Sequence, residues 1–238
     1  MKILITNDDG WDAPGIRALR EISAGFGDCV VVAPAAQQSG ISHQLTMNRP
    51  LNLVRREGEV WSLDGTPGDC VRIALSQMKE FEFDLVISGI NNGGNLGSDV
   101  YVSGTVAAAR ESAIFGVPAI AISQHRLRFK EQDYDWTFSK TAATRVLQHC
   151  LESLPPKGSY LNINLPDFCD HDEVPQFEIV DPCPLDRSPM PVTYRTVHSE
   201  EGASFEYAGK YRDRLREPGS DIDVCFSQGV SVTRIELP

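Results

Sequence analysis

The chain has 238 residues, of which 41% are hydrophobic and 23% are charged, and these proportions exclude a disordered or membrane chain. Its 22 Lys and Arg against 33 Asp and Glu give a formal net charge of −11, which repels nucleic acids and anionic membranes, so neither DNA nor a membrane is an expected partner. The N-terminus opens directly into a strand pattern without a leader, no apolar run has membrane-spanning length, and the expected location is the cytoplasm.

The first part of the chain alternates between strand and helix patterns. Residues 2–6, K-I-L-I-T, form a β-branched run that predicts a buried strand. A helix is expected to begin near Pro14, because apolar residues then recur every third position. The continuous apolar run 29–33 predicts a second strand, of the kind found in parallel sheets covered on both faces. A polar loop over residues 37–43 follows it.

The middle of the chain continues this alternation, and a further helix is expected to begin near Asp69. The other predicted strands are 51–55, 59–63, 84–88, 118–123 and 160–165, and the other predicted helices are 105–114 and 136–154. This order predicts an α/β protein, with a Rossmann-like, doubly wound, mostly parallel sheet and right-handed crossovers.

Beyond residue 165 the pattern changes to short β-like runs that are broken by Pro, Gly and charged residues. We therefore expect residues 1–165 to form a Rossmann-like catalytic core. Residues 166–238 are expected to form a C-terminal β-hairpin and loop extension. Such an extension can reach a partner subunit, so a role in oligomerisation is expected.

Polar side chains follow several of the predicted strands. In open α/β sheets the ligand lies beyond the carboxyl ends of the strands, so these loops are the places to search for a site. Asp8 and Asp9 follow the first strand, and two adjacent carboxylates repel each other unless solvent screens them or a cation neutralises them. An alternative stays open, in which one Asp caps the following helix and the other is solvated.

Two further loops supply oxygen atoms. Ser39 and Asn91 would add a hydroxyl and a carboxamide to the carboxylates, which makes an all-oxygen set suited to Mg²⁺ or Mn²⁺ rather than zinc. Alternatively, Ser-Gly and Asn-rich stretches are common in turns for backbone reasons. The fingerprints of dinucleotide sites, P-loops and nucleophile elbows are absent, which argues against the commonest NAD-dependent, NTPase and hydrolase classes.

A third feature lies at the start of the helix predicted at 105–114. Ser103, Gly104 and Thr105 stand where free backbone N–H groups and the helix dipole attract a phosphate. A locally positive place of this kind is needed, because the overall charge of the chain opposes phosphorylated substrates. These residues are also expected to provide the N-cap of this helix, and the two roles are compatible.

Five stretches, in the same order, resemble the SurE family of 5′-nucleotidases, also called survival protein E. They cover most of residues 1–123 and read ILITNDDG with APGI after it, VVAPAAQQSG with LT beyond it, GTPGDCV, DLVISGINNGGNLG, and YVSGTVAAARE. The final stretch, GSDIDVCFSQGVSVTRI, also resembles the C-terminal segment of that family, whereas residues 166–218 match it loosely.

The resemblance implies a Rossmann-like core, one divalent metal ion per subunit, and hydrolysis of nucleoside 5′- and 3′-monophosphates, with activity on short polyphosphate in some members. It also implies a homodimer or homotetramer that exchanges C-terminal elements. By position, the metal ligands would be Asp8, Asp9, Ser39 and Asn91, and the phosphate contacts would be Asn95, Ser103, Gly104 and Thr105. Asp8 or Asp9 could in addition act as base or nucleophile.

The chain departs from the family pattern after the S-G of the second loop. The family usually has Asn two or three residues later, whereas this chain reads S-G-I-S-H-Q and places His43 there. We expect His43 either to contact the phosphate or base of a substrate, or to be a solvated loop residue.

Two other classes of protein compete with a phosphatase. A signalling receiver also has paired acids after its first strand, but it needs a carboxylate at the end of its third, where this chain reads S-G-I-N. A nucleotide-binding protein without catalysis would use the same loops only to hold its ligand.

Overall fold

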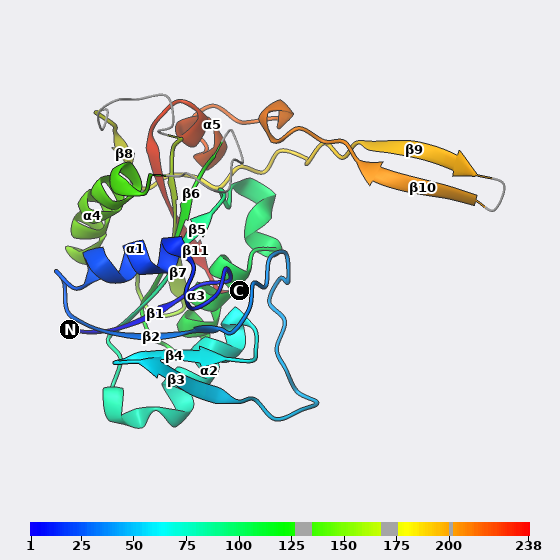
Figure 1. Ribbon diagram of the computed structural model, residues 1–238. Helices are drawn as coiled ribbons and strands as arrows, with labels where there is room; N and C mark the ends of the chain where they lie inside the picture. Colours follow the sequence, from blue (N-terminus) through cyan, green and yellow to red (C-terminus); the bar gives the residue numbers. More distant parts are fainter. Residues whose placement is uncertain (127–134, 168–175, 200–201) are drawn as a thin grey trace.

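The computed structural model describes residues 1–126, 135–167, 176–199 and 202–238. A nine-stranded sheet forms the centre of this part of the chain, in the order β3-β4-β2-β1-β5-β6-β7-β11-β8 (Figure 1). Its strands are β1 (Lys2–Thr6), β2 (Asp28–Pro34), β3 (Leu53–Glu57), β4 (Val60–Leu63), β5 (Leu85–Asn92), β6 (Ala119–Gln124), β7 (Ser159–Leu165), β8 (Ile179–Val180) and β11 (Val230–Glu236). The α-helices are α1 (Pro14–Ser23), α2 (Pro67–Gln77), α3 (Gly104–Ile114), α4 (Thr137–Leu151) and α5 (Asp221–Phe226).

The sheet is mostly parallel, and its winding reverses at its centre. β1 pairs in parallel with both β2 and β5, and β6 and β7 continue the parallel part. The chain moves from β1 outward to β2, and later returns to β5 on the other side of β1. Such a reversal opens a crevice at the carboxyl ends of the two strands, where doubly wound proteins bind ligands. The predicted α/β class is confirmed.

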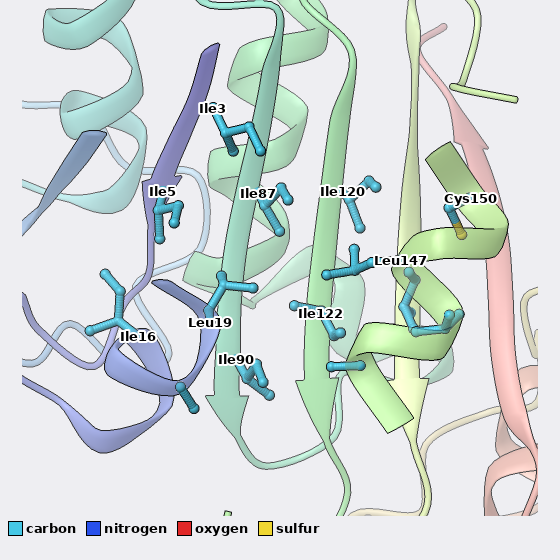
Figure 2. Packing of buried hydrophobic residues seen from close by; sticks show 14 of the residues in the cluster. Ile3, Ile5, Ile16, Leu19, Ile87, Ile90, Ile120, Ile122, Leu147 and Cys150 are labelled. Carbon is cyan, nitrogen blue, oxygen red and sulfur yellow. The ribbon is translucent and has the colours of Figure 1, made fainter. Parts of the chain in front are cut away.

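Helices cover both faces of the sheet. Ile3 and Ile5 of β1 belong to the apolar cluster beneath α1 and α4, while Leu4 belongs to the cluster beneath α2 and α3. Figure 2 shows the first cluster, in which Leu19 of α1 and Leu147 of α4 pack over the strands. These side chains are fully buried, and each stabilises the fold by about 1.5–3 kcal/mol relative to exposure. The sheet is thereby a rigid support for the loops at its edge.

The helix α2 begins earlier than the sequence pattern predicts. Thr66 is its N-cap, because its Oγ1 accepts a hydrogen bond from the N–H of Asp69 at 3.1 Å. The carboxylate of Asp69 accepts one in return from the N–H of Thr66 at 3.0 Å. Pro67 occupies the first helical position, where its missing N–H costs nothing. Asp69 is therefore the third helical residue, in a capping box, and not the start of the helix.

The C-terminal part divides between the main sheet and a separate hairpin. β11 lies antiparallel to β7 and pairs in parallel with β8 on its other side. The hairpin of β9 (Tyr194–Ser199) and β10 (Gly202–Tyr207) forms a two-stranded sheet of its own, which extends away from the body in Figure 1. The short helix α5, which the sequence pattern does not predict, precedes β11 and is capped by Ser220. None of the helices in the described ranges has the length and apolar character to cross a membrane.

Candidate functional site

The turn after β1 places Asp8 and Asp9 where the winding of the sheet reverses. The side chain of Asn7 closes this turn, since its Nδ2 donates to the carbonyl of Gly10 at 2.8 Å and its Oδ1 accepts from the N–H of Gly10 at 3.1 Å. Gly10 has a φ of +113°, a conformation that favours glycine. The N–H of Gln38 donates to the carbonyl of Asp8 at 2.7 Å. The loop after β2 is thereby fixed beside the acidic turn.

Asp8 is buried against the first turn of α3. Its Oδ1 accepts a hydrogen bond of 2.5 Å from Oγ1 of Thr105. Gly104 allows this close packing, because a Cβ at that position would lie 2.8 Å from the Cβ of Asp8. Burial raises the pKa of Asp8 to about 7, the neighbouring charge of Asp9 raises it too, and the Thr105 hydrogen bond opposes both. A carboxylate in such a place favours a bound proton or cation.

Asp9 is less buried than Asp8 and faces the end of β5. Its Oδ2 accepts a hydrogen bond from the N–H of Asn92 at 3.3 Å. Burial raises the pKa of Asp9, whereas the Asn92 N–H and the positive charge of Arg126 lower it. The two carboxylates therefore lie between the ends of β1 and β5, at the reversal.

A bulge carries β5 further along the chain than predicted, to Asn92. The pairing of β5 with β6 shifts between Ser88 and Asn91. Gly89 lies at this bulge with a φ of +136°, and a Cβ there would come within 2.2 Å of the carbonyl oxygen of Ile122. Bulges re-aim the side chains at the end of a strand. The two asparagines thus belong to a strand end that faces the site, and not to the loop that the sequence predicts.

The carboxamides of Asn91 and Asn92 are held in different ways. Nδ2 of Asn91 donates to the carbonyl of Gly93 at 2.8 Å, which orients the side chain. Oδ1 of Asn92 is buried without a hydrogen-bond partner among the described residues. Such atoms are rare in folded proteins, and an ion or ligand is one way to satisfy them. The family resemblance selects Asn91 of the two by its position in G-I-N, although nothing in the stretch I-N-N-G itself distinguishes the chemistry of these neighbouring asparagines.

The loop after β2 leaves Ser39 exposed. Its Oγ accepts a hydrogen bond from Nε2 of Gln37 at 2.8 Å, and no hydrogen bond joins it to the paired carboxylates in the part of the chain that the structure describes. Further along, the N–H of Ser42 donates to the carbonyl of Val102 at 2.9 Å, which ties this loop to the segment before α3. Ser39 therefore lies on a loop that is anchored on both sides of the site.

His43 is neither solvated nor free to turn, because it binds a buried carboxylate. Its Nε2 lies 2.8 Å from Oε2 of Glu111, whose side chain is 1% exposed. Nε of Arg72 donates to the other oxygen, Oε1, at 2.7 Å. Burial by itself would raise the pKa of Glu111, but hydrogen bonds from His43 and Arg72 outweigh it and lower the pKa. Sequence reasoning misses Arg72 and Glu111, since they lie far from His43 along the chain.

The two remaining predicted contacts are held by polar networks. Of the three residues predicted to supply the N-cap of α3, Ser103 is the cap, with its Oγ accepting from the N–H of Val106 at 3.1 Å. Asn95 is buried: its Nδ2 donates to Oγ of Ser123 at 2.8 Å, and its N–H donates to Oδ1 of Asn164 at 2.8 Å. The carboxamide nitrogen of Asn95 is therefore engaged by β6, while the start of α3 faces Asp8.

The donor set at the reversal fits a hard divalent cation. Two adjacent carboxylates with raised pKa values lie at the reversal, and Asp9 accepts a hydrogen bond from the backbone N–H of Asn92, whose buried carboxamide oxygen has no partner within the described ranges. Carboxylate, carboxamide and hydroxyl oxygens are the ligands that Mg²⁺ and Mn²⁺ prefer. No group of three or more His, Cys, Asp or Glu that could hold a metal lies within the described residues.

Fold and site together define a doubly wound α/β protein with an acidic centre at its winding reversal. Residues 3–184 match the family model described as survival protein SurE, and the chain belongs to that family. The resemblance seen in the sequence is thus confirmed.

Known proteins support this assignment over the whole chain. A protein of Nostoc sp. (strain PCC 7120 / SAG 25.82 / UTEX 2576) is 42% identical over 100% of both chains. The 5′-nucleotidase SurE of Acinetobacter baylyi is 46% identical over 70% of this chain and 66% of its own. The crystal structure of the SurE protein from Aquifex aeolicus superposes with a TM-score of 0.86 at 31% identity, covering 99% of this chain and 93% of the other.

Proposed function

We propose that the chain is a divalent-metal-dependent phosphatase that hydrolyses nucleoside 5′-monophosphates, and 3′-monophosphates as well, to nucleoside and phosphate. Membership of the SurE family and the relatives named 5′-nucleotidase SurE support a phosphoric monoester hydrolase that acts on nucleotides. One observation carries the proposal: Asp8 is buried beside Asp9 and against the first turn of α3. An acidic pair and a helix N-terminus therefore meet, and a cation and a phosphate can bind next to each other.

The proposed cofactor is one Mg²⁺ or Mn²⁺ per subunit. Its ligands would be Asp8, Asp9, Ser39 and Asn91. Ser39 is exposed on its loop and would exchange its hydrogen bond from Gln37 for this role. When bound, such an ion neutralises charge on the phosphoryl oxygens and lowers the pKa of a bound water.

The start of α3 suits the phosphate. The N–H groups of Gly104 and Thr105 belong to the first turn and have no partner inside the helix, and Gly104 has no side chain to keep a ligand away. Asn95, Ser103 and His43 are proposed as further contacts with phosphate or substrate. Because Nε2 of His43 already binds Glu111, only its Nδ1 is available for this purpose.

Asp8 and Asp9 suit different tasks. Asp8 is 5% exposed and held by Thr105, so it is suited to holding a fixed position. Asp9 is more exposed and accepts a hydrogen bond of 3.3 Å from the N–H of Asn92, so it is the carboxylate that can more easily approach a substrate. We propose that Asp9 either removes the proton from the attacking water or itself attacks phosphorus.

Phosphate release from GMP and AMP in the presence of Mn²⁺ tests the proposed function. We expect turnover by the wild-type chain and a loss of about 100-fold or more in Asp8→Asn, because the proposed metal ion, which stabilises the transition state by several kcal/mol, would lose one of its two carboxylate ligands. The exposed Asp12, four residues further along, provides the control Asp12→Asn, which should retain activity. A wild-type chain that binds AMP but releases no phosphate from any nucleotide would be a binding protein and not a phosphatase.

The C-terminal extension is proposed to serve assembly. Residues 1–165 would carry catalysis, and residues 166–238 would hold a homodimer or homotetramer together. Four large side chains of the β9–β10 hairpin are exposed, as expected for a surface that a second subunit covers: Tyr194, Val197, Phe205 and Tyr207. Short polyphosphate as a second substrate, and the cytoplasm as the place of action, stay predictions.

A further inference from the structure

A cavity of about 340 Å³ lies beyond the end of β6, next to the acidic centre. Its lining consists of His125, Arg212, Arg216, Cys225, Phe226 and Gln228. The volume is within the range of sites for small organic ligands. Nothing in the proposed chemistry of phosphate release uses these residues, so the cavity needs an explanation of its own.

Aromatic rings form one wall of this cavity. The imidazole of His125 stacks on the ring of Phe226 with centroids 4.9 Å apart and planes inclined by 19°, and on its other neighbour, Tyr211, at 5.5 Å. The hydroxyl of Tyr211 donates to Oδ2 of Asp99 at 2.6 Å, which fixes the turn that carries it. Nε2 of His125 is buried without a partner among the described residues. Flat, preorganised rings of this kind are suited to stacking with a planar ligand.

Two arginines line the cavity of a chain that is otherwise strongly acidic. Arg216 lies over the ring of Phe226 at 5.7 Å and is only loosely paired with Asp223, at 3.5 Å. Arg212 is exposed and forms no ion pair within the described ranges. Arg214, between them, is instead buried and bound to Asp99 at 2.5 Å, which holds the turn in place. The turn thus presents its two outer arginines to the cavity as hydrogen-bond donors.

The cavity lies within reach of a substrate whose phosphate sits at the acidic centre. Asn92, which binds Asp9, pairs with Gln124 across β5 and β6. His125 directly follows Gln124, so the aromatic wall begins one strand, or about 5 Å, along the sheet from the end of β5. A ribose bridges a comparable span between the phosphate and the base of a nucleotide.

We infer that this cavity is the subsite for the nucleobase, and that it favours a purine, guanine in particular. The inference rests on the proposed function, and it specifies which nucleoside monophosphates are the preferred substrates. The base would stack on Phe226 and His125, and Arg212 and Arg216 would donate to its acceptors. Guanine offers two adjacent acceptors, O6 and N7, and arginine is their commonest partner in proteins.

A second cavity on the other side of the centre fits a base less well. It measures about 470 Å³ and lies between the loop after β2 and the residues that precede α2. Its lining contains no aromatic ring, and its single arginine, Arg49, is already paired with Asp64 at 3.3 Å. It offers neither a stacking surface nor a free cationic donor.

Binding of guanosine to the metal-free protein tests the subsite without any catalysis. Guanosine carries no phosphate, so its affinity by calorimetry reports on the base and sugar alone. We expect Arg212→Ala and Phe226→Leu each to weaken binding about tenfold, toward the lower end of the range for losing one stacking or donor group. Arg234→Ala removes an exposed arginine from β11, outside the cavity lining, and should leave the affinity unchanged. Unchanged binding in both cavity variants, or binding of pyrophosphate in place of guanosine, would overturn the inference.

Steady-state kinetics with and without a base separate this inference from the proposed function. We expect Arg212→Ala and Phe226→Leu to raise KM for GMP about tenfold with kcat within about twofold of wild type, and to leave turnover of ribose 5-phosphate unchanged. Equal losses on both substrates would mean that the two side chains act structurally, and the inference would be wrong. Guanosine binding at the cavity by a wild-type chain that hydrolyses no nucleotide would refute the phosphatase and retain the base site.

Discussion

The hydroxyl of Thr105 donates a hydrogen bond of 2.5 Å to Oδ1 of Asp8, and so joins the first turn of α3 to the end of β1. These two residues are 97 positions apart in the chain. The contact stabilises the charged form of a carboxylate whose pKa is raised by burial and by Asp9. It therefore favours the state of Asp8 in which a cation can bind.

Loss of this hydroxyl should weaken metal binding. In Thr105→Val the shape of the side chain is kept, but the charged form of Asp8 loses a hydrogen bond of the kind that contributes about 1.5–3 kcal/mol. We expect the affinity for Mn²⁺ at neutral pH, measured by calorimetry, to fall about tenfold or more. Thr105→Ser retains a hydroxyl and should bind Mn²⁺ within a few-fold of wild type. Equal affinities in the valine variant and wild type would show that the contact plays no part.

Gly104 should not tolerate a side chain. Alanine is ordinarily the better helix residue by about 1 kcal/mol, but a Cβ at this position would lie 2.8 Å from the Cβ of Asp8 and displace it. We expect Gly104→Ala to reduce both Mn²⁺ affinity and phosphate release. The control is Gly25→Ala, where the nearest atom to a Cβ is 3.4 Å away. A Gly104→Ala protein with wild-type metal affinity would contradict the tight packing.

Metal removal gives a prediction about stability. A ligand that binds only the folded state at 100 times its Kd stabilises that state by about 2.7 kcal/mol, which is a rise in Tm of roughly 5–10 °C for a chain of this size. Mn²⁺ should therefore raise the Tm of the wild-type protein, and EDTA should reverse the change. In Asp9→Asn, which loses one of the paired carboxylates, the rise should disappear. A rise of the same size in that variant would place the ion elsewhere.

Glu111 should be more important for stability than an exposed acid. Its carboxylate is 1% exposed and binds both His43 and Arg72, so Glu111→Gln leaves the partly buried guanidinium of Arg72 without its countercharge and weakens the contact with His43. We expect the free energy of unfolding, from urea titration, to fall by about 2–3 kcal/mol. Glu57→Gln removes an acid whose side chain is 70% exposed and paired with Arg20, and should cost at most ~0.5 kcal/mol.

His125 should make the fold sensitive to mild acid. Burial lowers its pKa from 6.5 to about 4, helped by the charges of Arg212 and Arg214 and opposed by those of Asp167 and Asp99. Between these two pKa values the imidazole of His125 is mostly protonated in the unfolded chain and mostly neutral in the folded chain. Stability is therefore complete above pH 6.5 and is lost as the pH falls toward 4, by an amount on the order of 3 kcal/mol.

The variant His125→Asn should flatten this dependence. Its free energy of unfolding should fall less steeply between pH 6.5 and 4.5 than that of the wild-type protein. The difference between the two slopes should correspond to the uptake of about one proton on unfolding. The comparison variant is His149→Gln, because the His149 side chain is 45% exposed and lies at the surface beside Asp181. Parallel curves for wild type and His125→Asn would show that His125 is not the titrating group.

Local patterns in the sequence determine most of the elements and half of the site. The runs at 2–6 and 29–33 predict buried strands because β-branched, continuous apolar segments suit a sheet covered on both faces. The paired carboxylates, and the N-cap at Ser103, are evident because each follows directly from neighbouring residues. Such features depend on contacts within a few positions of the chain, which a sequence displays.

Tertiary structure decides which residues from distant parts of the sequence lie in contact. The partner of His43, Glu111, is 68 positions away, Arg72 binds the same carboxylate from α2, and no local pattern predicts that cluster. The backbone N–H of Asn92 contacts Asp9 after a bulge in β5, at which β6 lies too close to Gly89 for any side chain. Likewise, the C-terminal strand β11 joins the main sheet by pairing with the edge of β7 that β6 does not occupy. Contacts between distant segments depend on how the whole sheet packs, and only the folded chain contains that information.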